Sequence, residues 1–167
     1  MFEFHNLKFE DIISIDSLTI NKNEVTCIVG PSGSGKSTLL RLINKMISPT
    51  SGYISLDDKD IADIDSINYR RRVPMLSQSP ITFPGTIRDN LLIGRKFQEK
   101  KAVSDKDLID ALAKVKLNMD LDEDISNLSG GEKQRISIAR LMLLDSEIYL
   151  LDEPSSALDL SLIHIWR

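Results

Sequence analysis

The sequence GPSGSGKS at residues 30–37 decides the fold class, because it matches the pattern G-x-x-x-x-G-K-[ST] in full. The apolar, mainly β-branched run VTCIV precedes it at residues 25–29 and predicts a strand buried on both faces. Apolar residues then follow at helical spacing from Leu39 to Met46. A strand, a glycine-rich loop and a helix in this order predict a loop that binds phosphate groups.

The residue types of this loop predict a nucleoside triphosphate site. Its glycines let consecutive backbone N–H groups face a polyphosphate, and the N-terminus of the next helix adds a positive end. Lys36 is expected to place its charge beside the β- and γ-phosphates, and the Ser37 hydroxyl to be a Mg²⁺ ligand. A dinucleotide site for hydride transfer fits poorly, because the loop is not G-x-G-x-x-G. The residues expected to bind the nucleotide here are Gly30, Pro31, Ser32, Gly33, Ser34, Gly35, Lys36, Ser37 and Thr38.

Composition is that of an ordinary globular domain. The chain has 167 residues, of which 41% are hydrophobic and 28% charged, and its net charge of -4 gives no general reason to expect nucleic acid as a partner. No apolar run approaches the roughly 20 residues that span a bilayer, and the start lacks the pattern of a signal peptide. The single cysteine, Cys27, suits a reducing cytosol and is expected to fill the core.

Further along the chain, strand-like and helix-like segments alternate, which predicts an α/β domain with a largely parallel sheet. Two β-like runs at the start predict an additional strand pair. Ser104 and Ser129 are expected to cap helices, the second of them reaching Leu144. The expected strands are residues 2–9, 12–20, 25–29, 53–56, 73–76 and 148–151, and the other expected helices are residues 39–46, 66–72 and 86–92.

The strand predicted at residues 148–151 is followed by two acidic residues, which are expected to bind the metal ion and to activate water. Asp152 is expected to hold Mg²⁺ or its waters from the side opposite the phosphate loop. Glu153 is expected to lie near the γ-phosphate and to accept a proton from an attacking water. After a complete phosphate loop, a solvated strand end is the weaker explanation of this acidic pair.

The segment LSGGEKQ at residues 128–134 predicts a second anion site. Helix capping accounts for Ser129. It does not account for Gly130 and Gly131, because glycine lowers helix propensity. Two glycines beside a helix start expose backbone N–H groups to an anion. One nucleotide needs only one phosphate loop, so this second site is expected to serve the ATP of another subunit.

In combination, order and spacing these motifs resemble the ATP-binding subunit of ABC transporters, and the resemblance covers residues 2–159. It implies an α/β P-loop NTPase fold, namely an ABC-type ATPase core with an N-terminal antiparallel β-subdomain and a helical subdomain. It implies ATP and Mg²⁺ as cofactors, and ATP hydrolysis that powers transport through a membrane-spanning permease subunit. The subunit would then be cytoplasmic and peripheral on the inner face of the cell membrane.

The resemblance also implies roles for individual residues in a head-to-tail dimer. In this dimer each ATP lies between the phosphate loop of one subunit and residues 128–134, the signature segment, of the other. Gln78 would sense Mg²⁺ and water, and Asp159 would make a contact across the dimer. The implied catalytic residues are Glu153, Lys36 and Gln78; the metal ligands are Ser37, Gln78 and Asp152; and the residues facing the partner's ATP are Ser129, Gly130 and Gly131.

Two segments bear on the type of ABC protein. Residues 80–91 are similar to the F-x-G-T-I-x-x-N segment of exporter ATPases and of small stand-alone metal- or iron-export ATPases. Residues 124–127 differ from the TEVGE-like segment of large exporters, which favours a separately encoded subunit. Phe9 is the only candidate for stacking on adenine, with core packing as its equal alternative. A soluble ABC ATPase that is not coupled to transport, and a nucleotide-binding fragment without turnover, remain competing hypotheses.

The last residues predict an incomplete domain. Residues 1–159 are expected to form an ABC ATPase domain with a helical subdomain at about residues 90–129. The resemblance implies that this domain lacks the region of the switch histidine, which contacts the γ-phosphate in the family. Neither His5 nor His164 fits that role. Residues 160–167 include LSLIHI, which is similar to a translated transposon end and is expected to be non-native. We therefore expect impaired ATP hydrolysis, and an exposed apolar patch beside the strand of residues 148–151.

Overall fold

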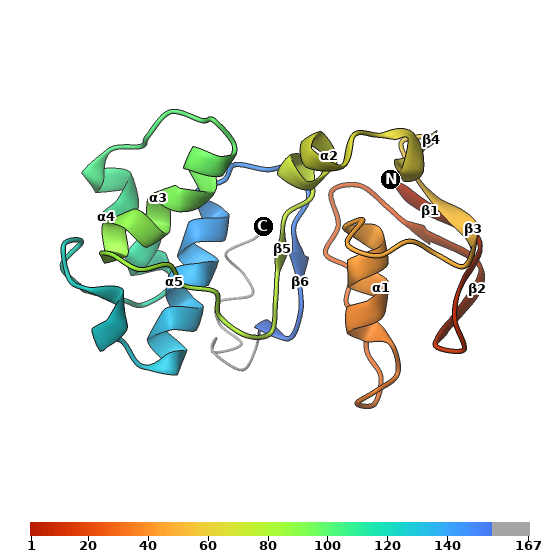
Figure 1. Cartoon of the computed structure of the whole chain (residues 1–167), viewed down its shortest axis with the longest axis horizontal. Helices are drawn as coiled ribbons and strands as arrows, with labels where there is room; N and C mark the ends of the chain where they lie inside the picture. The colour runs from red at the N-terminus through yellow and green to blue at the C-terminus, as the bar shows by residue number, and fades with distance from the viewer. Residues whose placement is uncertain (155–167) are drawn as a thin grey trace. The chain divides into compact units, whose positions relative to one another are not determined.

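The computed structural model describes residues 1–154, in which two compact units follow one another along the chain. The first unit is Met1–Met75, and the second begins at Leu76. Figure 1 shows a sheet and short helices in the first unit, and a group of helices in the second. Among the described residues, no helix is long and apolar enough to cross a bilayer.

The first unit is built on an antiparallel sheet. Strands β1 (Phe2–Phe9) and β2 (Ile13–Ile20) form a hairpin that pairs Phe2 with Ile20 and Phe9 with Ile13. Strands β3 (Ser51–Leu56) and β4 (Lys59–Asp60) complete the order β2-β1-β3-β4. The predicted antiparallel strands at the start of the chain are therefore confirmed. The buried apolar residues of this sheet are Phe2, Phe4, Leu7, Ile13, Ile54 and Leu56.

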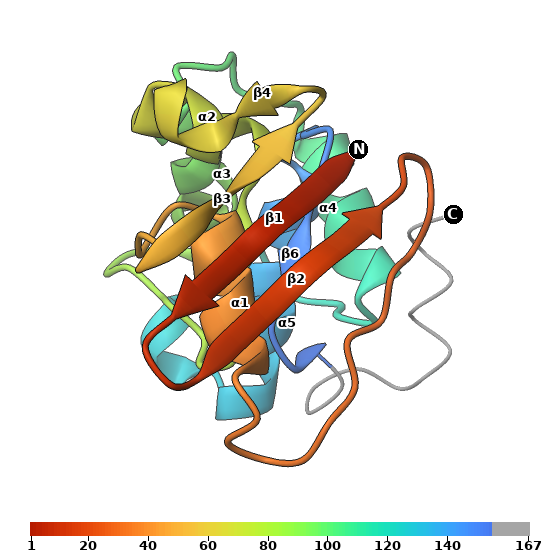
Figure 2. The same ribbon diagram turned by 90° about the vertical axis from the view of Figure 1, so that its right-hand side faces the viewer.

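Helix α1 (Lys36–Ile43) packs on this sheet, as Figure 2 shows behind β1 and β2. It buries Leu39, Leu42 and Ile43 on one side, in agreement with the helical spacing of the sequence. A short helix η1 (Ile61–Asp63) and helix α2 (Ser66–Arg72) follow the sheet. The buried Tyr69 hydroxyl donates a hydrogen bond of 2.6 Å to the Ile43 carbonyl, so α2 is joined to the end of α1.

The second unit is mainly helical. Helices α3 (Ile87–Phe97), α4 (Asp105–Lys114) and α5 (Gly130–Met142), with the short helix η2 (Ile125–Asn127), surround one apolar core. Strands β5 (Met75–Leu76) and β6 (Leu150–Leu151) form a separate two-stranded sheet. The core includes Ile87, Leu91, Leu108, Leu112, Val115, Ile136, Ile138 and Ala139.

Three helices of this unit begin with a capping box, in which the cap hydroxyl and the third helical residue exchange hydrogen bonds. The predicted caps at Ser104 and Ser129 are thereby confirmed, and Thr86 forms a third. Hydrogen bonds from the Ser104 hydroxyl and backbone lower the pKa of Asp107, and those from Ser129 lower the pKa of Glu132. These carboxylates are therefore held in the charged form that completes the caps.

Acid is expected to weaken the second unit through these caps. Because the folded pKa of Asp107 lies below its ordinary value of 3.8, its stabilising effect is complete above that pH and is lost as pH falls through the folded pKa. Urea unfolding from pH 7 to pH 3 should show this decline, and Asp107→Asn should both lower stability at pH 7 and flatten the decline. Asp110→Asn on the same helix is the matched control. Equal declines in Asp107→Asn and Asp110→Asn would contradict the expectation.

Three sequence-based expectations are wrong. Residues 25–29 form no strand, and Val25 and Val29 are 67% and 83% exposed. Cys27 is exposed as well, so it does not fill a core. The largest sheet of the described residues is antiparallel rather than parallel. A parallel strand exists only when neighbours pair with it, and none of the described strands pairs with residues 25–29.

The expected apolar patch beside residues 148–151 is also absent from the described residues of that strand. Leu150 is only 8% exposed, and Leu151 is half-buried. Tyr149 and Leu151 pack against the core of the second unit, which covers this part of the strand.

Candidate functional site

Residues 30–35 form an irregular loop that leads into α1. Gly33 and Gly35 have φ angles of 79° and 86°, in the left-handed region that glycine tolerates best. A Cβ atom on Gly35 would lie 2.8 Å from Cδ1 of Ile13, so a larger residue would clash with the hairpin. Gly35 is the N-cap of α1 and brings no side chain to cap it. The first turn of α1 can therefore face an anion with its backbone N–H groups.

Lys36 lies over this loop. Its ammonium donates hydrogen bonds of 3.0 Å to the Gly30 carbonyl and 2.8 Å to the Pro31 carbonyl. Both acceptors are neutral, and a phosphate oxygen would form a stronger, charge-assisted bond with the same ammonium. Ser37 and Thr38 follow in the same turn of α1 and are half-buried. The loop thus combines a cation, two hydroxyls and a helix N-terminus, the groups that bind a polyphosphate.

The acidic pair of the second unit lies at the end of β6. The backbone N–H of Asp152 donates a 3.0 Å bond to the Leu76 carbonyl, and Asp152 is 5% exposed. Gln78 follows the neighbouring strand, and its side-chain amide donates a 2.6 Å hydrogen bond to the Glu153 carboxylate. Glu153 has a φ of 48°, which is uncommon for a residue with a side chain. The structure therefore brings Gln78 and Glu153 into direct contact, a contact that the sequence did not reveal.

The signature segment begins helix α5. The Ser129 hydroxyl and backbone N–H both donate to the Glu132 carboxylate, at 2.6 Å and 2.8 Å. Gly130 and Gly131 are exposed, and a Cβ atom on either would meet no atom within 4 Å. Packing among the described residues therefore does not require glycine at these positions, although each glycine lowers helix stability.

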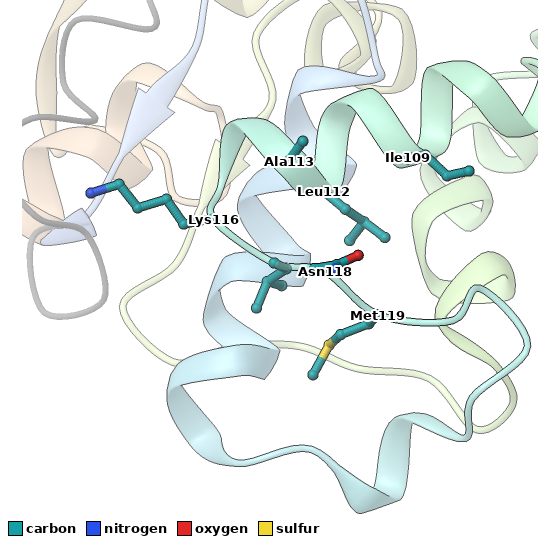
Figure 3. A pocket seen from close by; sticks show the side chains of 7 residues that line it. Ile109, Leu112, Ala113, Lys116, Asn118 and Met119 are labelled. Atoms are coloured by element: carbon teal, nitrogen blue, oxygen red, sulfur yellow. The ribbon is translucent and has the colours of Figure 1, made fainter.

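A separate pocket of about 280 Å³ lies beside α4 and the loop that follows it. Figure 3 shows Leu112 and Met119 at this pocket, with the ammonium of Lys116 directed away from it. None of the candidate site residues lines it. The lining residues are Ile109, Leu112, Ala113, Lys116, Leu117, Asn118 and Met119.

Comparison with known proteins identifies the family. A family model described as "ABC transporter" matches residues 13–156, which is most of the chain. The chain belongs to the ABC transporter family. The α/β P-loop NTPase fold expected from the sequence is thereby confirmed, and ABC ATPase domains bind ATP.

Three relatives of this ABC chain show the range of the family. Protein STAR1 of Oryza sativa subsp. japonica is 42% identical over 90% of the chain, and a phosphate import ATP-binding protein, PstB, of Rubrobacter xylanophilus is 41% identical over 86%. The chain spans only 43% and 55% of those two proteins. A bacterial Atm1-family ABC exporter, solved with ATP bound, is 30% identical, with a TM-score of 0.85 over 98% of this chain and 31% of the exporter. Import and export both occur among the relatives.

The candidate residues of this ABC chain are divided between its two units. The phosphate loop belongs to the first unit, whereas Gln78, Asp152, Glu153 and the signature segment belong to the second. Asp159, which is expected to make a contact across the dimer, lies outside the described residues, as do residues 160–167.

Proposed function

We propose that this chain is the part of an ABC transporter that binds and hydrolyses ATP to power transport. The phosphate loop is the observation that carries the proposal, because its left-handed glycines, its lysine and its uncapped helix start form a site for a polyphosphate. Lys36 neutralises charge on the β- and γ-phosphates, and the backbone of the loop holds the rest of the triphosphate. The residues assigned to this role are Gly30, Pro31, Ser32, Gly33, Ser34, Gly35, Lys36, Ser37 and Thr38.

Glu153 is proposed as the general base of hydrolysis. It accepts a proton from the attacking water, and Gln78 orients it through the hydrogen bond of 2.6 Å between their side chains.

Ser37, Gln78 and Asp152 are the proposed ligands of Mg²⁺. Their hydroxyl, amide and carboxylate oxygens are the hard donors that this ion prefers. No group of three or more His, Cys, Asp or Glu side chains within residues 1–154 could hold a metal ion unaided. Mg²⁺ commonly takes one or two carboxylates and completes its shell with waters and substrate phosphates. When bound, the ion neutralises charge on the phosphates.

The signature segment is proposed to face the ATP of a second ATPase subunit in a head-to-tail dimer. Exposed glycines that packing does not require, next to a helix start, leave room for a phosphate group to approach the backbone. Ser129, Gly130 and Gly131 therefore bind the partner's nucleotide, and Asp159 makes a contact across the dimer.

A membrane-spanning permease subunit is the proposed transport partner, with this chain on the cytoplasmic side of the cell membrane. The segment at residues 80–91 supports the small stand-alone export type, and one matched structure is named an ABC exporter. In this proposal residues 1–159 form the ATPase domain, with a helical subdomain at about residues 90–129.

Titration of the 167-residue chain with ATP, followed by release of inorganic phosphate, tests this function directly. We expect saturable binding of ATP that Mg²⁺ strengthens, and phosphate release that depends on Mg²⁺. Binding without release would favour the competing hypothesis of a nucleotide-binding fragment. Absence of binding in a chain that is folded by circular dichroism would overturn the proposal. Stimulation of hydrolysis by a permease in proteoliposomes separates a transport ATPase from a soluble one.

A further inference from the structure

Arg140, near the end of α5, makes an unusual set of contacts for a half-buried cation. Its guanidinium donates hydrogen bonds of 2.6 Å to the Asn90 backbone carbonyl, 2.8 Å to the Ile81 carbonyl and 3.1 Å to the Asn90 side-chain oxygen. It also lies 5.3 Å from the centre of the Phe83 ring. All of these partners belong to α3 or to the segment before it, so one side chain connects α5 to both.

Asn90 completes this arrangement from α3. Its side chain is fully buried, accepts a 2.9 Å bond from the Phe83 N–H and donates bonds of 2.8 Å to the Phe83 carbonyl and 3.0 Å to the Thr86 carbonyl. Residues 81–83 have no helix or strand of their own. Their backbone is therefore held by side chains at the Ile81 carbonyl and at both polar groups of Phe83.

The charge of Arg140 argues against a role in packing alone. Burial lowers the pKa of its guanidinium to about 10, so the group is still charged at neutral pH. No carboxylate of the described residues forms an ion pair with it, and backbone and amide oxygens satisfy its donors instead. Burial of a cation without a counter-ion costs free energy, whereas an apolar residue would pack there without that cost.

Backbone hydrogen bonds also connect the segment before α3 to the residues that precede α5. Gly85 accepts a 3.0 Å bond from the Ile125 N–H, and the Ile87 N–H donates a 2.9 Å bond to the Glu123 carbonyl. The segment that contains Glu123 and Ile125 leads directly to Ser129. The chain from Ile81 to Ile87 is therefore attached near both ends of α5, and Gln78 lies just before it.

We propose that Arg140 and Asn90 are positioning residues, which form a lock that holds residues 81–83 on α5 and thereby keeps Gln78 in contact with Glu153. The Arg140–Asn90 lock consists of these two side chains and the backbone of residues 81–83. Its catalytic consequence rests on the proposed function, whereas its structural consequence does not. No lock residue belongs to the phosphate loop, so the lock sets the rate of hydrolysis rather than the binding of ATP.

Arg140→Lys tests the lock, because an ammonium is a single point that cannot reach all three oxygens as the planar guanidinium does. Arg88→Lys is the matched control, since Arg88 lies on α3 but pairs with the exposed carboxylates of Asp105 and Asp122. For Arg140→Lys we expect amide hydrogen exchange at Phe83 to quicken about tenfold or more, because its hydrogen bond opens more often. We expect kcat to fall about tenfold or more while the KM for ATP stays within about twofold. Arg88→Lys should leave all three values at the level of the unaltered chain.

Asn90→Ser provides an independent variant if Arg140→Lys does not fold. It removes the amide bonds to Phe83 and should produce the same pattern, and the double variant should be no worse than about the worse single one, because both act on one segment. Two results would overturn the lock. One is unchanged amide exchange at Phe83 in a folded Arg140→Lys chain, and the other is a fall in kcat that is accompanied by a comparable rise in the KM for ATP. If the unaltered chain shows no turnover, the proposed hydrolysis fails, and the exchange measurement alone decides on the lock.

Discussion

Lys36→Ala is expected to abolish most ATP binding and to lower kcat/KM for ATP hydrolysis by on the order of a hundred- to a thousandfold. The Lys36 ammonium lies over the phosphate loop, where its hydrogen bonds to the described residues go to the carbonyls of Gly30 and Pro31. In the Lys36→Ala variant, no cation of the loop would neutralise the negative charge of a bound triphosphate. Binding of a fluorescent ATP analogue and release of phosphate measure the two losses separately.

Lys22→Ala is the matched control for this experiment. Lys22 belongs to the same unit, is exposed and forms a 2.8 Å ion pair with Asp57, outside the phosphate loop. An exposed pair of this kind contributes little to stability, so the control should bind and hydrolyse ATP as the unaltered chain does. Equal effects of the two substitutions would show that general charge, and not the loop, attracts the nucleotide.

Glu153→Gln is expected to lower kcat by about a hundred- to ten-thousandfold and to leave ATP affinity nearly unchanged, because it removes the base but no phosphate contact. The substitution keeps an oxygen that can accept the hydrogen bond from Gln78, so the contact between the two side chains is preserved. Single-turnover phosphate release and equilibrium ATP binding distinguish the two effects. Glu123→Gln, in the same unit but outside the candidate site, should hydrolyse ATP at the normal rate.

The contrast between the two substitutions makes the assignment specific. Loss of both binding and turnover is expected at Lys36, and loss of turnover alone at Glu153. If Glu153→Gln retained full activity, the general base would have to be another residue, and the role proposed for Gln78 would fall with it.

Much of the fold was predictable where neighbouring residues decide the structure. The capping boxes at Ser104 and Ser129 depend on hydrogen bonds between residues three apart, so the sequence contains all of their partners. The hairpin at the start follows from two adjacent strand-like runs. Helix α3 was also expected, although it extends to Phe97, beyond its predicted end.

That residues 25–29 form no strand was not predictable in the same way. The composition of this segment is that of a buried strand, yet Val25 and Val29 are largely exposed. Composition expresses a preference, but a strand also needs partners that come from distant parts of the chain. Arg140 was overlooked for a related reason, because its acceptors lie 50 and 59 residues away along the chain.

The sequence by itself determined the phosphate loop, the helix starts and the family, because these depend on backbone geometry written in short, contiguous motifs. Only the tertiary structure decided that Gln78 contacts Glu153 and that Arg140 and Asn90 hold residues 81–83. Gln78 and Glu153 are 75 residues apart, and their contact exists because β5 and β6 pair and end side by side. A buried polar group takes whichever partner the folded chain brings near, and that partner cannot be identified from its neighbours in the sequence.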